Sequence, residues 1–146
     1  MSVRKIVVHT DVFLDHLCEA RHPSVLRQVM GKFFCYTTVY QAIELFSIAK
    51  TDREAKAIED SMAAMKLMGL NPKNARMYGE LISSNKKIES WNILIAGLCL
   101  ESKLPILTDS KKDFAGIKGL TIVPTKLIEG DKSGEEILNR AQRKKP

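Results

Sequence analysis

Acidic side chains come directly after two short apolar runs of the sequence. Asp11 follows the run Lys5–His9 (KIVVH), and Asp109 follows the run Leu104–Thr108 (LPILT). Runs of this length and composition are typical of strands in a parallel sheet that is buried on both faces. Because ligands bind outside the carboxyl ends of such strands, we expect both aspartates to project from the same edge of the sheet.

Two further oxygen-bearing side chains lie in predicted helices near that edge. Glu44 stands in the otherwise apolar segment YQAIELF, and carboxylates are seldom buried without a partner or a metal. Asn92 falls in the first turn of an apolar helix that starts at Trp91. Singly, an aspartate after a strand is most often a turn or cap residue, and Asn92 is typical of a helix start. Together the four indicate an acidic site, and oxygen ligands are what Mg²⁺ and Mn²⁺ prefer.

The rest of the chain alternates between short apolar runs and amphipathic segments. This order, β-α-β-α-β-α-β-β, predicts an α/β fold with a mainly parallel central sheet of four to five strands between two helical layers. The predicted strands are 5–9, 32–36, 67–70, 104–108 and 120–123. The predicted helices are 12–20, 24–31, Thr37 or Thr38 to 49, Thr51 or Asp52 to 65, one opened by Asn71-Pro72, 91–101 with Ser90 as its cap, and 135–144.

Composition and charge narrow the class of protein. The chain has 146 residues, 45% of them hydrophobic, and a formal net charge of +6, which favours an anionic partner. No apolar run approaches the roughly 20 residues of a membrane span, so we expect a cytoplasmic protein without a membrane partner. The three cysteines are far apart among apolar neighbours and indicate buried thiols. The three histidines show no metal-ligand spacing.

Four short motifs, taken in order, resemble those of the PIN-domain family. They are HTDVFLDHL, TTVYQAIELF, WNILIAGL and LTDSKKDF, and they are most similar to the VapC-type toxins of toxin–antitoxin pairs. The resemblance covers residues 3–124 and predicts a PIN-like domain over residues 1–124. Residues 125–146 then form a basic extension that ends in a helix.

The resemblance implies a metal-dependent endoribonuclease. Asp11, Glu44 and Asp109 match the family's acids, and Asp113 is an auxiliary candidate for the Mg²⁺ or Mn²⁺ site. Asn92 stands where the family usually has aspartate. An amide oxygen can still coordinate a cation, but it carries no charge and accepts no proton. Further candidates for contact with RNA are the hydroxyls of Thr37 and Thr38 and the lysines Lys86, Lys87, Lys111 and Lys112.

Asn92 leaves several readings open. The site can be natural and active with one acid fewer, natural and silent, or altered by an introduced substitution. A silent PIN domain would bind RNA or a protein partner without cutting, and a DNase of the broader family is a further alternative. The resemblance also implies a small antitoxin as partner and a homodimer.

Overall fold

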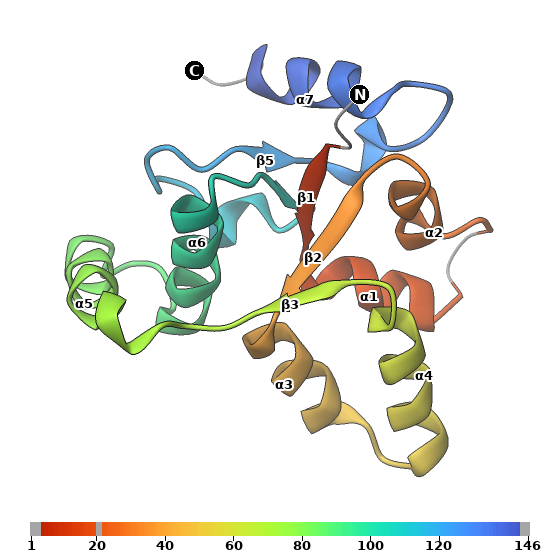
Figure 1. Ribbon diagram of the computed structural model, residues 1–146, viewed down its shortest axis with the longest axis horizontal. Coiled ribbons are helices and arrows are strands. Elements are labelled where there is room, and N and C mark those ends of the chain that lie inside the picture. Colours follow the sequence, from red (N-terminus) through yellow and green to blue (C-terminus); the bar gives the residue numbers. More distant parts are fainter. Residues whose placement is uncertain (1–3, 20–21, 144–146) are drawn as a thin grey trace.

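Five parallel strands form one sheet with the order β3-β2-β1-β4-β5 (Figure 1). The computed structural model describes residues 4–19 and 22–143. The strands are β1 (Lys5–Val8), β2 (Phe34–Thr38), β3 (Lys66–Met68), β4 (Ile106–Leu107) and β5 (Ile122–Val123). At the centre, Val7 pairs with Tyr36 of β2 on one side and with Ile106 of β4 on the other. All four strand pairings are parallel, which confirms the predicted sheet.

Helices cover both faces of this sheet. They are α1 (Thr10–Leu17), α2 (Val25–Met30), α3 (Val39–Ile48), α4 (Asp52–Met62), α5 (Ala75–Ser84), α6 (Ser90–Ser102) and α7 (Gly134–Arg143), with the 3-10 turns η1 (Pro72–Asn74), η2 (Lys111–Asp113) and η3 (Thr125–Leu127). Ile6 and Val8 pack with residues of α1, α2, α4 and α7, whereas Val7 packs with residues of α6. Because neighbouring strand residues point to opposite faces, one strand serves two cores. The predicted three-layer α/β/α fold is therefore confirmed.

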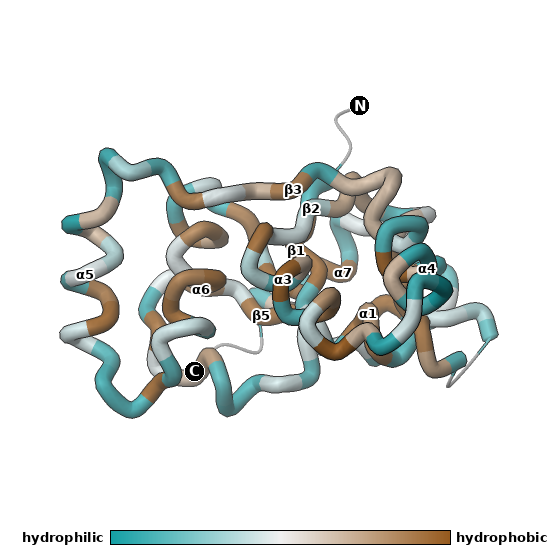
Figure 2. Tube along the Cα trace, turned by 90° about the horizontal axis from the view of Figure 1, so that it is seen from below, coloured by the Kyte–Doolittle hydropathy of each residue, from teal (hydrophilic) through white to brown (hydrophobic). Residues whose placement is uncertain are grey.

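Apolar residues gather in the middle of the fold, and hydrophilic residues lie along α4 and the outer loops (Figure 2). The largest fully buried side chains include Phe13, Phe114, Leu45 and Ile137, which come from both cores. Within the part of the chain that the structure describes, no helix is long and apolar enough to cross a membrane.

Helix starts follow the local signals closely. Thr38 caps α3 in a capping box with Gln41, and Thr51 caps α4 in the same way with Glu54. Ser24 caps α2 by accepting a hydrogen bond from the Arg27 amide. The predicted helix 91–101 is present as α6, but its N-cap is Glu89, without a side-chain cap bond, and not Ser90.

Several other boundaries differ from the predicted ones, including the starts of β2 and α1 and both ends of β4. Strand β2 begins at Phe34 and not at Lys32, because the amides of Lys32 and Phe33 donate to the Val29 carbonyl and extend the end of α2. Helix α1 begins at Thr10, two residues before its predicted start. Its predicted end at residue 20 lies outside the described residues.

The C-terminal segment packs into the same core as the strands. Ile128 and Ile137 are fully buried, and Ile137 lies in the core cluster that contains Ile6 and Val8. Lys32 Nζ also donates to the Ile128 carbonyl at 2.7 Å, and so joins residues 96 positions apart. The final helix was predicted, and its described residues close the core.

Candidate active site

An open cleft of about 440 Å³ lies at the carboxyl ends of the central strands. Its acidic and amide lining consists of Asp11, Glu44, Glu89, Asn92 and Asp113. The remaining lining residues are His9, Thr10, Leu14, Trp91 and Ser110. These side chains come from the β1–α1 junction, from α3, from the start of α6 and from the segment after β4. The cleft lies where the order of parallel strands predicts it.

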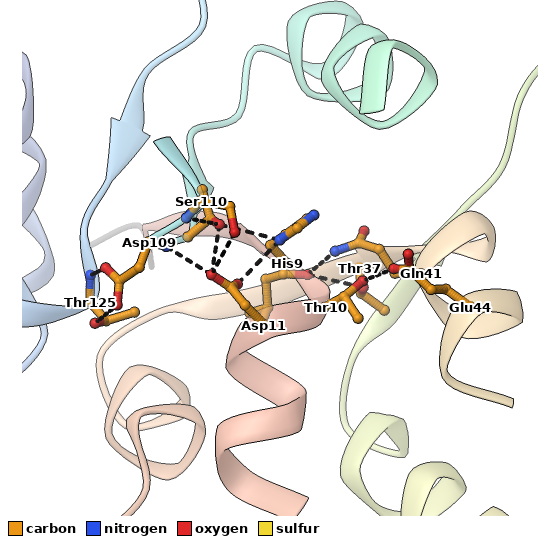
Figure 3. A network of polar contacts seen from close by, with 11 residues as sticks. His9, Thr10, Asp11, Thr37, Gln41, Glu44, Asp109, Ser110 and Thr125 are labelled. Atoms are coloured by element: carbon orange, nitrogen blue, oxygen red, sulfur yellow. Dashed lines mark hydrogen bonds and ion pairs between the residues drawn. The ribbon is translucent and has the colours of Figure 1, made fainter. Parts of the chain in front are cut away.

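Asp11 is the most strongly held acid of this cleft (Figure 3). Its Oδ2 accepts hydrogen bonds from Thr108 Oγ1 and from the Asp109 amide, both at 2.9 Å. Its Oδ1 lies 3.2 Å from Nδ1 of His9. Burial alone would raise the pKa of Asp11, but these hydrogen bonds and the charge of His9 outweigh burial and lower the pKa below its ordinary value of 3.8. Asp11 is therefore an anion at neutral pH.

Glu44 has a single hydrogen-bonding partner among the described side chains. Its Oε1 accepts from Thr10 Oγ1 at 2.5 Å, across the gap between α1 and α3 (Figure 3). The half-buried position of Glu44 explains why an acid interrupts the apolar segment YQAIELF. Its carboxylate faces the cleft, with Oε2 outside this hydrogen bond.

Asp109 turns its side chain away from the cleft. Its Oδ1 accepts from the Thr125 amide at 2.9 Å and its Oδ2 from Thr125 Oγ1 at 2.5 Å, at the start of η3 (Figure 3). Only the backbone of Asp109 serves the cleft, through its hydrogen bond to Asp11. The predicted convergence of the two carboxylates therefore does not occur, because Thr125 holds the second one.

Asn92 and Asp113 both line the cleft, as their predicted roles require. Asn92 lies in the first turn of α6 and is half-buried. Asp113 is the last residue of η2, and its amide donates to the Ser110 carbonyl. The cleft is thus lined by the acids Asp11, Glu44, Glu89 and Asp113 and by one amide side chain.

The hydroxyls of Thr37 and Thr38 are buried away from the cleft. Thr37 Oγ1 donates to the Val8 carbonyl at 3.1 Å, and Gln41 Nε2 donates to the same carbonyl at 2.5 Å. Thr38 caps α3. Both threonines are fully buried, so they hold the ends of β1 and β2 and have no surface to offer a substrate.

The four predicted RNA-contacting lysines are exposed. Lys111 and Lys112 belong to η2, next to Asp113. Lys86 and Lys87 lie in the connection that leads into α6. None of the four lines the cleft itself.

Sequence reasoning missed several residues of the cleft. His9 is buried, packs edge-on against Phe114 and contacts Asp11, although it had been set aside for lack of a metal-ligand pattern. Its place at the end of β1, the same signal that singled out Asp11, could have identified it. Trp91, which was predicted only as the start of a helix, packs against Tyr40 and also lines the cleft.

The fit of the cleft to a divalent cation depends on its donors. Within residues 4–19 and 22–143, no three His, Cys, Asp or Glu side chains lie close enough together to form a closed metal cage. Mg²⁺, however, is usually held by one or two carboxylates, together with waters and substrate phosphates. Asp11 and Glu44, with Asn92 and Asp113 beside them, match that donor set. The residues therefore fit a hydrated cation that is shared with a phosphate.

Solved structures with the same arrangement of elements come from toxin–antitoxin complexes. One chain of VapBC2 from Rickettsia felis, bound to a promoter DNA fragment, superposes with a TM-score of 0.70 at 15% identity, over 82% of this chain and 98% of that one. A chain of DNA-bound VapBC from Salmonella typhimurium gives 0.71 at 13% identity, over 85% and 99%. The fold is that of a VapC-like PIN domain.

A third structural match extends over nearly the whole chain. PAE2754 from Pyrobaculum aerophilum superposes with a TM-score of 0.54 at 11% identity, over 99% of this chain and 100% of that one. No family model matches the sequence, and no curated protein matches it. At such low identities the likeness concerns the PIN fold, and the chemistry has to be argued from the cleft.

Proposed function

We propose that this chain is a Mg²⁺- or Mn²⁺-dependent endoribonuclease of the VapC toxin type, weakened by Asn92. One observation carries the proposal: Asp11, Glu44, Asn92 and Asp113 line a single cleft at the carboxyl ends of the strands of a PIN fold. The reaction is hydrolysis of an RNA phosphodiester bond that leaves a 5′-phosphate and a 3′-hydroxyl. The activity would be exercised in the cytoplasm.

The side chains of the cleft have separate tasks in this reaction. His9, Thr108 and the amide of residue 109 keep Asp11 ionised and fixed in direction, so that it can bind a cation without reorganising. Thr10 orients Glu44 in the same way. A cation held by these two acids would activate water for attack on phosphorus and neutralise charge on the leaving oxygen.

Lysine side chains at the edge of the cleft would bind the RNA backbone. Lys111 and Lys112 are exposed on η2, beside the cleft residue Asp113. Lysine contacts to phosphates carry no sequence information, but they position the strand and make binding sensitive to salt. The net charge of +6 supports the same type of partner.

Asn92 is the position at which the rate can be restored. It lies in the first turn of α6, where an aspartate would gain about 0.3–1 kcal/mol from the helix dipole. Aspartate there would also add one negative charge to the cleft. We expect Asn92→Asp to raise metal-dependent cleavage roughly 10- to 100-fold, the usual range for residues that tune a metal site.

The test is RNA cleavage in Mn²⁺ or Mg²⁺ by this chain and three variants. Asn92→Asp should cut faster, and Asp11→Ala should not cut. Asp131→Ala, an exposed acid away from the cleft, is the matched control and should cut like the parent chain. Equal cleavage by Asp11→Ala and the control would refute the site.

A second function has its own supporting observation. Both oxygens of Asp11 already have hydrogen-bonding partners, and no three acidic, histidine or cysteine side chains of the described residues cluster closely. We propose as the alternative a PIN domain that binds RNA or a protein without cutting. It predicts equal RNA affinity in EDTA and in Mg²⁺, and no cleavage by Asn92→Asp. Competition between RNA and DNA oligonucleotides tests the DNase alternative.

A small antitoxin and a second copy of the chain are the proposed protein partners. The structures with this fold named above include VapBC complexes, and α3 exposes the large apolar side chains of Ile43, Phe46 and Ile48. Contiguous apolar residues on a surface favour protein contacts. Light scattering of the chain and of Ile43→Glu checks the homodimer, because a dimer held by α3 should dissociate in the variant.

A further inference from the structure

A second hollow lies at the opposite edge of the sheet from the candidate active site. Its volume is about 560 Å³, larger than that of the cleft and within the usual range for small-ligand sites. Lys5, the first residue of β1, lines it, and so does Pro105, which immediately precedes β4. We call this hollow the basal pocket, because it lies at the amino ends of the strands.

Cations from separate segments converge on the basal pocket. Arg4 and Lys5 come from the start of β1, and Lys103 comes from the end of α6. Among the described residues that line the pocket, none is acidic. Arg4 lies 3.6 Å from Glu135, with both side chains about half or more exposed, and such a pair is weak. The pocket therefore carries an excess of positive charge.

Polar and apolar groups complete the lining. Thr121 and Gln142 offer hydrogen-bonding side chains, and Leu104 and Leu138 form an apolar part of the pocket wall. A purely inorganic anion would leave this apolar wall unused, whereas a ligand with a phosphate beside a flat organic group would use both kinds of surface. A nucleotide has this chemistry.

The backbone conformation of Lys103 also supports a role for its charge in the basal pocket. Lys103 ends α6 in the left-handed conformation, with φ of 57°, which favours glycine and is strained for other residues. Glycine would relieve the strain but would bring no charge to the pocket. The partial negative charge at the end of α6 also attracts a lysine, so the test has to separate the two roles.

We propose that the basal pocket binds the phosphate of a nucleotide, either within an RNA strand or as a free mononucleotide. Lys5 and Lys103 supply the main charge, with Arg4 beside them. The basal pocket lies at the amino ends of the strands, whereas Asp11 lies at their carboxyl ends. Binding in the basal pocket therefore does not depend on cleavage in the candidate active site.

The experiment measures binding of a fluorescent oligouridylate by anisotropy in EDTA, with unlabelled UMP as competitor. The double variant Lys5→Glu/Lys103→Glu is compared with Lys50→Glu/Lys66→Glu, two exposed lysines that lie outside the pocket. Both doubles lower the net charge equally. We expect the first to weaken binding about tenfold or more and to reduce the salt slope by roughly 0.7 per lysine, and the second to change affinity little. Equal losses in both doubles, or no binding by the parent chain, would overturn the proposal.

A single substitution and the competitor complete the design. Lys103→Gly should raise thermal stability while weakening binding, and unchanged binding would show that Lys103 serves only the helix end. Displacement of the oligouridylate by UMP identifies a free nucleotide as sufficient, and failure of UMP to compete identifies the RNA strand as the source of the phosphate. Since EDTA prevents metal-dependent cleavage, failure of the nuclease proposal would leave these outcomes intact.

Discussion

Substitution of Asp109 by alanine tests whether this acid is structural or catalytic. Its carboxylate accepts two hydrogen bonds from Thr125, at 2.9 Å from the amide and at 2.5 Å from the hydroxyl. Hydrogen bonds to a charged acceptor contribute about 1.5–3 kcal/mol each, and Asp109 is exposed, which favours the lower end of that range. We therefore expect Asp109→Ala to lower the free energy of unfolding by about 3 kcal/mol. For a chain of this size, each kcal/mol shifts the Tm by about 2–4 °C.

The assay is urea unfolding of the parent, of Asp109→Ala, of Thr125→Val and of the double variant. Thr125→Val removes the hydroxyl but keeps the amide, so its loss should be smaller than that of Asp109→Ala. The double variant should lose less than the sum of the two single variants, because they share an interaction. Per folded molecule, Asp109→Ala should keep its Mn²⁺-dependent cleavage. Unchanged stability together with abolished cleavage would show that Asp109 is a metal ligand and not a structural residue.

Three further predictions follow from burial and contact distances. The folded-state pKa of Asp11 is lowered, so the stabilisation by its carboxylate is present above about pH 4 and is lost as the pH falls through the folded pKa. The difference in unfolding free energy between the parent and Asp11→Asn should therefore shrink on acidification, and a constant difference between pH 3 and pH 7 would contradict this. Gly97→Ala would place a Cβ 2.2 Å from the Tyr78 ring and should lower the free energy of unfolding, measured by thermal unfolding, by about 1–3 kcal/mol. At Gly79 a Cβ would meet nothing within 4 Å, so Gly79→Ala should raise the free energy of unfolding by about 0.5–1 kcal/mol through α5. Cys18 is exposed, so the prediction of three buried thiols holds only for Cys35 and Cys99. A thiol reagent should label Cys18 at neutral pH and leave the two buried cysteines intact, because burial raises their pKa to about 12. Rapid labelling of all three would contradict the burial.

The order of elements could be predicted because its signals are local. Capping residues such as Thr38 and Thr51 act within one helical turn, and apolar runs define the strands directly. Boundaries that depend on a neighbouring turn were harder to predict. The late start of β2 comes from amide bonds back to Val29, which the apolar letters KFFCY do not reveal.

The segments that form the candidate site were predicted, but the directions in which their side chains point were not. Position at a strand end correctly brought Asp11 to the cleft. The same signal predicted Asp109 there, but its carboxylate accepts hydrogen bonds from Thr125, sixteen residues away in the chain. No periodic pattern encodes that contact. His9 was not predicted, because the histidines were considered only as metal ligands and not as hydrogen-bonding partners of a neighbouring acid.

The closure of the core by α7 has a consequence for the synthesis of the protein. Ile137 is completely buried in the core cluster that contains Ile6 and Val8, and the space beside Gly134 is filled by Phe33 and Arg4. The growing chain therefore exposes part of this core until α7 has been synthesised. A premature stop before the codon of Ile137 would therefore give a product that aggregates or is degraded, and not a shortened but working domain.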